Sequence, residues 1–229
     1  MPFLLLTICV ILTFAPSVTN GFNIDDIAFL NGETALLFPS WTDFFTKTPN
    51  QHYTPLNFLL NIFLFEHLPA NPVPFRLINI LLFLTNCWLL YSLLKLITQN
   101  KNLALATALI FCLHPLNITI VNRISFNIVL LCLAGMEISL IGLWLTIQYP
   151  RAKKYCILYL LSAVLAMLCQ EIALLLPVYA AAMLFFLSPL SFKKIARSCT
   201  PLFLLVFVFL LIWFNLAGPG DIWKKSSTL

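Results

Sequence analysis

The sequence predicts an all-α integral membrane protein, on the strength of its apolar composition, its scarcity of charge and its long apolar runs. Of 229 residues, 61% are hydrophobic and 9% are charged, and the mean hydropathy is +0.97. An ordinary soluble chain has about 45–50% apolar and about 25% charged residues. Continuous Leu, Ile and Phe runs, rather than alternating hydrophobicity, favour membrane helices over a membrane barrel.

About seven transmembrane helices are expected, because polar or proline-containing stretches separate the apolar runs. The runs cover residues 3–18, 75–98, 103–114, 126–148, 155–169, 171–189 and 201–216. The third run ends at His114-Pro115, where proline removes a backbone donor. The fifth and sixth runs form one apolar region of about 35 residues, and a single helix of about 52 Å would exceed a hydrocarbon core of about 30 Å. We therefore divide this region at Gln170-Glu171.

The domain organisation follows from these runs. Residues 1–217 are expected to form a single transmembrane domain, with residues 218–229 as a short C-terminal tail. Residues 19–74, the long polar stretch, are expected to form an external loop. Aromatic residues recur there at helical spacing, which predicts short amphipathic helices on the membrane surface over residues 27–45 and 55–65.

Charge fixes the expected topology, with the N-terminus inside. The first run carries no preceding Lys or Arg, so an uncleaved helix is preferred over a signal peptide cleaved near Ala15 to Val18. Inside loops then hold eight of the thirteen basic residues and no acid, as the positive-inside rule requires. They are Lys95, Lys101, Arg151, Lys153, Lys154, Lys193, Lys194 and Arg197. The net charge of +5 therefore reflects topology, and no nucleic-acid partner is expected.

The same topology gathers scattered polar residues on the non-cytoplasmic face. Asp25, Asp26, His114, Arg123, Glu171 and Asp221 all come to this side. The seven cysteines lie in or beside apolar runs without paired spacing or nearby histidines, so neither a disulfide framework nor a metal site is expected.

Four segments carry a resemblance to a known family. They are FNIDDIAFLNG, then YTPLNFLLNIFLFEHLPANPVPFRLINILLFLTNCWLLYSLLKL, then LIFCLHPLNITIVNRIS, then AMLCQEIALLLP. In this order the chain resembles, from about residue 20 to about residue 190, the N-terminal half of GT-C membrane glycosyltransferases. It is most similar to protein O-mannosyltransferase-like enzymes, including the tetratricopeptide-bearing group and its bacterial relatives.

The resemblance implies sugar transfer from a polyprenyl-phosphate sugar, with no other cofactor. Such transfer takes place at the outer face of the bacterial cytoplasmic membrane or the lumenal face of the endoplasmic reticulum. Asp25 and Asp26 match the acid that activates or places the acceptor hydroxyl, with Asp25 slightly preferred. The alternative is that this pair caps a helix. Glu171 matches a third acid, or alternatively caps the helix that follows it.

The candidate substrate-binding residues are less complete. His114 matches the His of the family's His-Pro pair, and a helix-end histidine bonded to a carbonyl is the alternative. Arg76 and Arg123 are the cations left to hold a phosphate, provided that they face the cavity. Asn79 is a further candidate, although a hydrogen bond to a neighbouring helix is the commoner role for such a residue.

Departures from the family pattern keep a second function open. Thr54 and Gln170 stand where the family carries a cation, and Thr119 stands where it carries an acid. Related enzymes also have further spans after the seventh. The chain is therefore interpreted either as a shortened glycosyltransferase, completed by another membrane subunit or by forming an oligomer, or as a catalytically degenerate accessory subunit of a larger membrane complex. Glu137, at the centre of an apolar run, marks either a site or a contact between helices, and we favour the contact.

Overall fold

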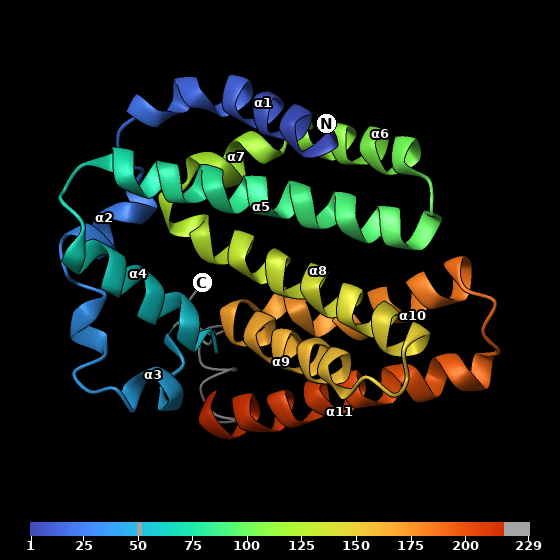
Figure 1. Ribbon diagram of the computed structural model, residues 1–229. Coiled ribbons are helices and arrows are strands. Elements are labelled where there is room, and N and C mark those ends of the chain that lie inside the picture. The colour runs from blue at the N-terminus through green and yellow to red at the C-terminus, as the bar shows by residue number, and fades with distance from the viewer. Residues whose placement is uncertain (50–51, 218–229) are drawn as a thin grey trace, which may run out of the picture.

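The structure, a computed structural model, describes residues 1–49 and 52–217, and every regular element in that part of the chain is a helix (Figure 1). The all-α prediction is confirmed for these residues. Within them, four helical segments are long and apolar enough to cross a membrane: Pro2–Thr19, Pro72–Thr98, Ile124–Gln148 and Phe192–Leu216. This finding is compatible with a membrane protein. The predicted tail, residues 218–229, lies outside the described residues.

The bundle helices run back and forth between two ends of the molecule (Figure 1). They are α1 (Pro2–Phe14) with η1 (Ala15–Thr19), α5 (Pro72–Thr98), α6 (Lys101–Cys112), α7 (Asn117–Asn122), η4 (Ile124–Phe126), α8 (Asn127–Gln148), α9 (Lys153–Cys169), η5 (Glu171–Leu175), α10 (Leu176–Leu187) and α11 (Phe192–Ala217). Asparagine caps fix two of the starts, because the Asn71 side chain accepts from Val73 N at 3.0 Å, and that of Asn100 accepts from Leu103 N at 3.1 Å.

The loop between the first two long helices folds over one end of the bundle. It contains α2 (Ile24–Leu30), η2 (Ala35–Leu37), α3 (Asp43–Thr46) and α4 (Pro55–His67). The helix expected over residues 27–45 is thus divided into separate pieces. Gly32 adopts φ +71°, which favours glycine, and Pro39 lacks a backbone donor. The stacked rings of Phe38 and Phe44, with centroids 4.7 Å apart, form a small core for the loop.

Helix α8 lies at the centre of the bundle. In Figure 1 it runs between α5 on one side and α9, α10 and α11 on the other. Its contact with α9 is close because glycine lines it: a Cβ on Gly142 would lie 2.9 Å from the backbone N of Tyr159. In the same contact, Ser139 Oγ donates to the Tyr159 carbonyl at 2.9 Å. Small residues that let two backbones approach are typical of helix pairs in membranes.

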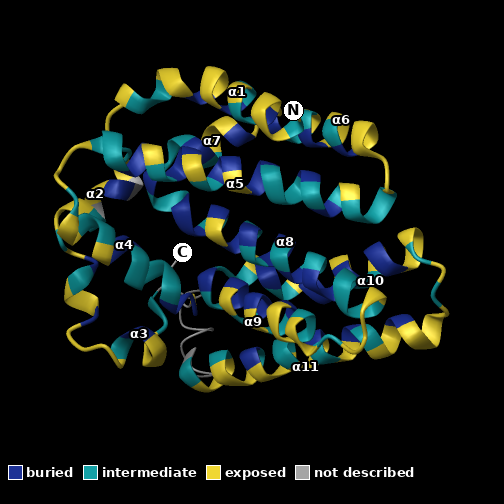
Figure 2. Ribbon diagram, in the orientation of Figure 1, coloured by how far each residue is buried: buried dark blue, intermediate teal, exposed yellow. Residues whose placement is uncertain are grey.

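The outer faces of the flanking helices are apolar and exposed. Figure 2 shows exposed residues along α1 and α11. On α11 the exposed large side chains are Phe192, Phe203, Leu204, Phe207, Val208, Leu211, Ile212 and Phe214. Continuous apolar surface of this kind marks a membrane or protein contact.

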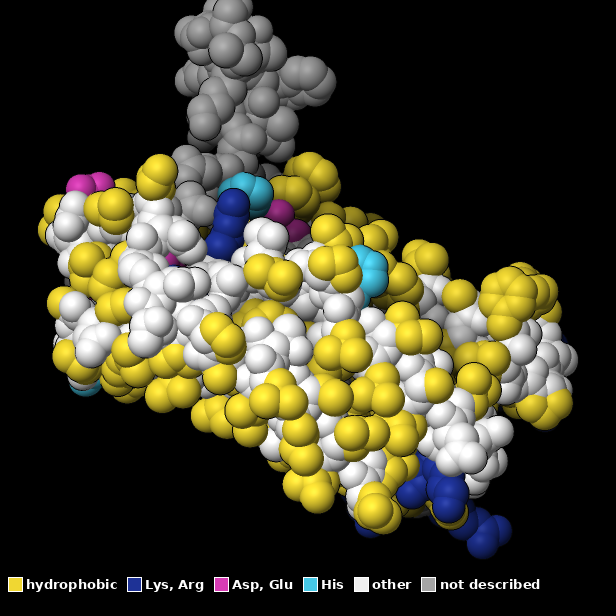
Figure 3. Space-filling view, turned by 90° about the horizontal axis from the view of Figure 1, so that it is seen from above, with side chains coloured by type: hydrophobic (Ala, Val, Ile, Leu, Met, Phe, Trp, Pro, Cys, Tyr) yellow, Lys and Arg dark blue, Asp and Glu magenta, His cyan; other side chains and the backbone are white. Residues whose placement is uncertain are grey.

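The two ends of the bundle carry different charges. The eight basic residues of the expected inside loops lie in the helix ends that flank the turns after α5, α8 and α10, with Arg151 in the turn after α8, and we name this the basic end. The loop helices α2 to α4, together with the junctions after α6 and α9, lie at the opposite end, which we name the loop end (Figure 1). Figure 3 shows a group of Lys and Arg side chains at one end of the visible face, whereas the acidic side chains lie toward the other end, where a basic side chain also lies near them.

Candidate functional site

Asp26 is a buried tie between the external loop and the bundle. Its side chain is 0% exposed. One carboxylate oxygen, Oδ2, accepts from the backbone N of Asn23 at 2.9 Å, and the other, Oδ1, accepts from the backbone N of Ser125 at 3.0 Å. The first bond belongs to the capping box that starts α2, and the second reaches η4. Both oxygens of Asp26 are therefore engaged by backbone donors.

Arg76 lies at the start of α5 and is also buried, at 2% exposed. Its Nε donates to the carbonyl of Asn20 at 3.0 Å. Its two terminal nitrogens donate to the carbonyls of Asn122 at 2.7 Å and Gly21 at 2.5 Å. The negative charge of Asp26 acts on this guanidinium and offsets part of its desolvation. Every nitrogen of the Arg76 side chain thus binds backbone.

Asn79, one turn further along α5, completes this arrangement. Its Nδ2 donates to the carbonyls of Val121 at 3.1 Å and Arg123 at 2.7 Å. These carbonyls belong to the end of the short helix α7, where the last carbonyls have no partner within the helix. Asp26, Arg76 and Asn79 therefore join the external loop to the junction between α7 and α8, and we name these three residues the clasp.

Glu171 lies in a separate cluster, at the start of η5. Its Oε1 accepts from the backbone N of Tyr53 at 3.0 Å, and its Oε2 lies 3.0 Å from His52 Nδ1. The Glu171 side chain is 24% exposed and that of His52 is 62% exposed. The ring of Tyr53 is buried and packs against Phe209 of α11, with ring centroids 5.4 Å apart. Glu171 thus anchors the end of the loop and still reaches solvent.

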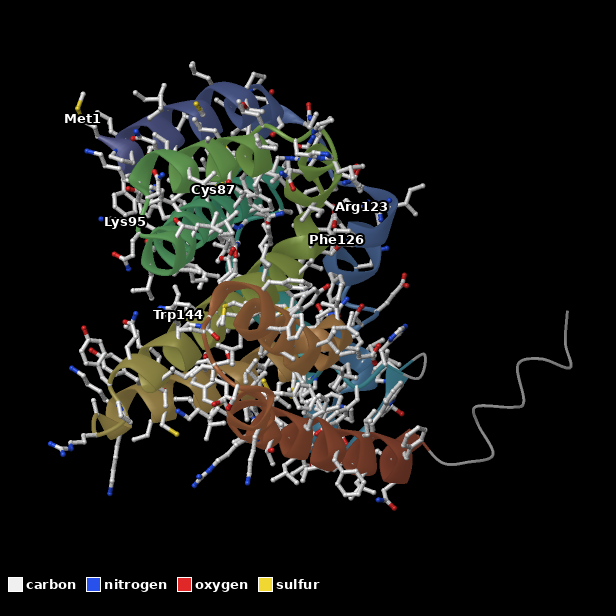
Figure 4. The ribbon with its side chains drawn as sticks, turned by 90° about the vertical axis from the view of Figure 1, so that its right-hand side faces the viewer. Met1, Cys87, Lys95, Arg123, Phe126 and Trp144 are labelled. Carbon is white, nitrogen blue, oxygen red and sulfur yellow. The ribbon has the colours of Figure 1, made fainter. Side chains whose placement is uncertain are left out.

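The remaining predicted residues lie outside these two clusters. His114 is exposed after α6, and its Nδ1 accepts from the backbone N of Leu116 at 3.3 Å. Arg123 places its guanidinium over the ring of Phe126, 5.0 Å from the ring centroid. Figure 4 shows Arg123 and Phe126 close together, on the opposite side of the view from Met1 and Lys95. Asp25 belongs to α2, and its side chain lies outside the description.

Sequence reasoning missed several partners of these residues. His52 gave no signal, because it is an isolated histidine in a polar loop. Asn23 did give one, since an Asn followed three residues later by an acid is a capping-box pattern. A further buried pair, Asn127 Nδ2 donating to Asn61 Oδ1 at 2.9 Å, joins α8 to α4. Ser125 contributes only its backbone N to Asp26, and no side-chain pattern reports that contact.

The cavity at the loop end is built from other residues. It has a volume of about 420 Å³ and lies between η2, α3 and α4. Phe38, Trp41, Phe63, Glu66 and His67 are among its lining residues, and no predicted site residue is. Among the described residues, no group of three or more His, Cys, Asp or Glu side chains is placed to hold a metal ion.

Comparison of the chain with protein-family models, with curated proteins and with solved structures finds no match.

Proposed function

We propose that this chain is a GT-C-like membrane protein that acts as a non-catalytic accessory subunit of a larger membrane complex. One observation carries the proposal: both oxygens of the acid and all three nitrogens of the cation in the clasp are already hydrogen-bonded to backbone groups. The membrane would be the bacterial cytoplasmic membrane or that of the endoplasmic reticulum, with the loop end on the non-cytoplasmic side.

The chemistry of sugar transfer explains why the clasp favours this function. A general base must reach the acceptor hydroxyl with a free oxygen, whereas Asp26 is buried and both of its oxygens accept from backbone N–H groups. A departing phosphate needs cationic donors, whereas all three nitrogens of Arg76 donate to carbonyls. These residues are suited to holding the loop in place.

The proposal includes seven membrane crossings. Besides the four long segments, α6 with 12 residues, α9 with 17 residues and η5 with α10 over Glu171–Leu187 would cross. At 1.5 Å per residue, α6 would span about 18 Å and α9 about 25 Å, so thinning of the bilayer or polar flanks must cover the difference from about 30 Å. The basic end would then face the cytoplasm, in keeping with the positive-inside rule.

Glycosyl transfer from a polyprenyl-phosphate sugar is the second candidate, and the Glu171 cluster favours it. Glu171 is hydrogen-bonded to His52 and partly open to solvent at the loop end. A carboxylate paired with an imidazole is suited to acid–base work on a hydroxyl. Asp25 would be the remaining acid of the resemblance for this reaction.

A transfer assay distinguishes the two functions. The whole chain, reconstituted in lipid vesicles, is incubated with polyprenyl-phosphate carrying a labelled sugar and with hydroxyl acceptors. The accessory function predicts no labelled product above protein-free vesicles. Product formed by the wild type and lost in Glu171→Gln or Asp25→Asn would overturn that function and establish the enzyme. Glu66→Gln serves as the control acid, because Glu66 lines the loop cavity away from both clusters.

A further inference from the structure

The central helix α8 has two chemically different faces. Gly135, Ser139 and Gly142 recur at helical spacing and pack against α9. At about 100° per residue, Glu137 projects from nearly the opposite side. Glu137 also lies at the midpoint of the 22-residue helix, far from either polar end. The acid therefore belongs to a surface that α9 does not cover.

That surface is a groove with α8 as its floor and α5 and α10 as its walls. The groove has a volume of about 500 Å³. Apart from Glu137 and Tyr179, its lining consists of Leu, Ile, Val and Met side chains, among them Leu94 of α5, Leu133 of α8 and Met183 of α10. Volume and lining fall in the range of sites that receive an apolar ligand oriented by one polar group. We name it the Glu137 groove.

Glu137 is the unsatisfied group in this groove. Its side chain is 5% exposed, and its Oε2 is buried without a hydrogen-bond partner among the described residues. The ion pairs of the described chain lie elsewhere, at Lys47 with Asp43 and at His52 with Glu171. A carboxyl inside a membrane is costly unless another group pairs with it. The described chain supplies no ion-pair partner for Glu137, so a cationic group from outside it can take that place.

The position of Glu137 at the middle of α8 decides which kind of partner can supply a cationic group to it. Cationic lipid head groups remain at the membrane surface, and hydrocarbon tails carry no donor, so lipid leaves Glu137 unpaired. A transmembrane helix can carry a Lys or Arg at mid-depth, opposite the midpoint of α8. A groove of about 500 Å³ also accepts several side chains of such a helix, which would pack between α5 and α10.

We propose that the Glu137 groove binds a transmembrane helix of a partner protein, and that a Lys or Arg at the middle of that helix pairs with Glu137. The inference rests on the proposed accessory function and names the chemistry of its partner. The apolar walls seat the partner helix, and the charge pair sets its depth and selects it over purely apolar helices.

A binding measurement with designed helices tests this inference. The probe is a synthetic transmembrane peptide of Leu and Ala with one central Lys, compared with a peptide of the same length that has Leu there. Energy transfer from labelled full-length protein to labelled peptide is measured in phosphatidylcholine vesicles. The Lys peptide is expected to bind wild type about tenfold more tightly than the Leu peptide, as one paired group inside a membrane allows. Glu137→Gln should abolish most of that preference, and Glu66→Gln should leave it unchanged.

The remaining outcomes are equally decisive. Equal binding of the Lys and Leu peptides, or a preference that survives Glu137→Gln, would overturn the inference in favour of plain lipid or apolar contact. Leu133→Trp, which fills the groove and keeps the Glu137 carboxyl, should weaken the binding of both peptides. If the Leu133→Trp variant binds the peptides as tightly as the wild type, the peptides bind outside the Glu137 groove and the inference is wrong. Sugar transfer by a protein that still selects the Lys peptide would refute the accessory function alone, whereas absence of both transfer and selection would refute the groove alone.

Discussion

Asp26 and Glu137 are both buried carboxyl side chains, at 0% and 5% exposed, yet their surroundings differ. Asp26 accepts a backbone N–H on each oxygen and lies beside the guanidinium of Arg76. Glu137 has a buried oxygen with no partner in the described chain. Desolvating a carboxyl costs several kcal/mol. At the clasp, that cost is offset inside the fold, so Asp26 stabilises the monomer. In the groove no group of the described chain offsets the desolvation cost of Glu137, so this residue favours association with a partner helix.

The largest expected effect is at Arg76. Arg76→Ala removes donors from the carbonyls of Asn20, Gly21 and Asn122 and leaves Asp26 without its cation. Leaving a buried acceptor without its donor costs about 1–3 kcal/mol, so the loss of donors from three carbonyls should cost at least about 3 kcal/mol, measured by unfolding in detergent micelles. Arg76→Lys should recover only part of it, because one ammonium cannot serve three carbonyls.

Lys47→Ala is the matched control for Arg76, because Lys47 forms an exposed ion pair with Asp43 at the same end. Such pairs contribute little, so its unfolding midpoint should equal that of the wild type. Equal stability of Arg76→Ala and wild type would contradict the structural role of the clasp. Arg76 would then be a candidate for ligand binding.

Substitution of Asp26 should cause a smaller loss of stability than substitution of Arg76. Asp26→Asn keeps the size of the side chain but replaces one acceptor oxygen by a donor, which then faces the backbone N–H of Asn23 or Ser125. Hydrogen bonds to charged groups contribute about 1.5–3 kcal/mol each, and we expect a loss in that range. Proteolysis should also cut the external loop faster, since the clasp holds it down. A variant that is as stable and as resistant as the wild type would remove Asp26 from the clasp.

The two faces of α8 give the third prediction. Gly142→Ala places a Cβ 2.9 Å from the backbone N of Tyr159, and a backbone atom cannot move aside cheaply. Overpacking of this kind costs about 1–3 kcal/mol. Gly21→Ala is the control, because nothing lies within 4 Å of its added Cβ. The unfolding midpoint in micelles should fall for Gly142→Ala alone, and equal midpoints for the two variants would show that α8 and α9 are not tightly packed.

The sequence predicted the helices well because apolar runs report directly on length and burial. The sequence predicts helices over residues 75–98 and 126–148, which correspond to α5 and to the end of η4 followed by α8. The loop was harder. A helix over residues 27–45 fits the aromatic spacing, but the local preferences of Gly32 and Pro39 override that spacing.

The candidate site was predictable only in part, for a physical reason. The sequence singled out Asp26, Arg76 and Asn79 as polar groups that apolar surroundings must accommodate, and the structure brings these three together. Their partners are mostly carbonyls and N–H groups of other segments, which every residue carries. A residue pattern therefore marks the polar side chain but not the backbone that satisfies it, so an acid suited to catalysis and an acid suited to a clasp look alike.

The smallest expected change in stability is at Glu137. Its sign is opposite to that expected at Asp26, because substitution of Glu137 should stabilise the isolated chain. Glu137→Leu replaces an unpaired carboxyl by an apolar side chain of similar length, in a groove lined by Leu, Ile and Met. Since an unpaired buried polar group costs about 1–3 kcal/mol, the isolated chain should become more stable, by about 1 kcal/mol at the low end of that range. Unfolding of the monomer in micelles measures the change. The same variant should lose its selection for the Lys peptide, so stability and binding move in opposite directions. A destabilised Glu137→Leu monomer would mean that the acid is satisfied within the fold, as Asp26 is.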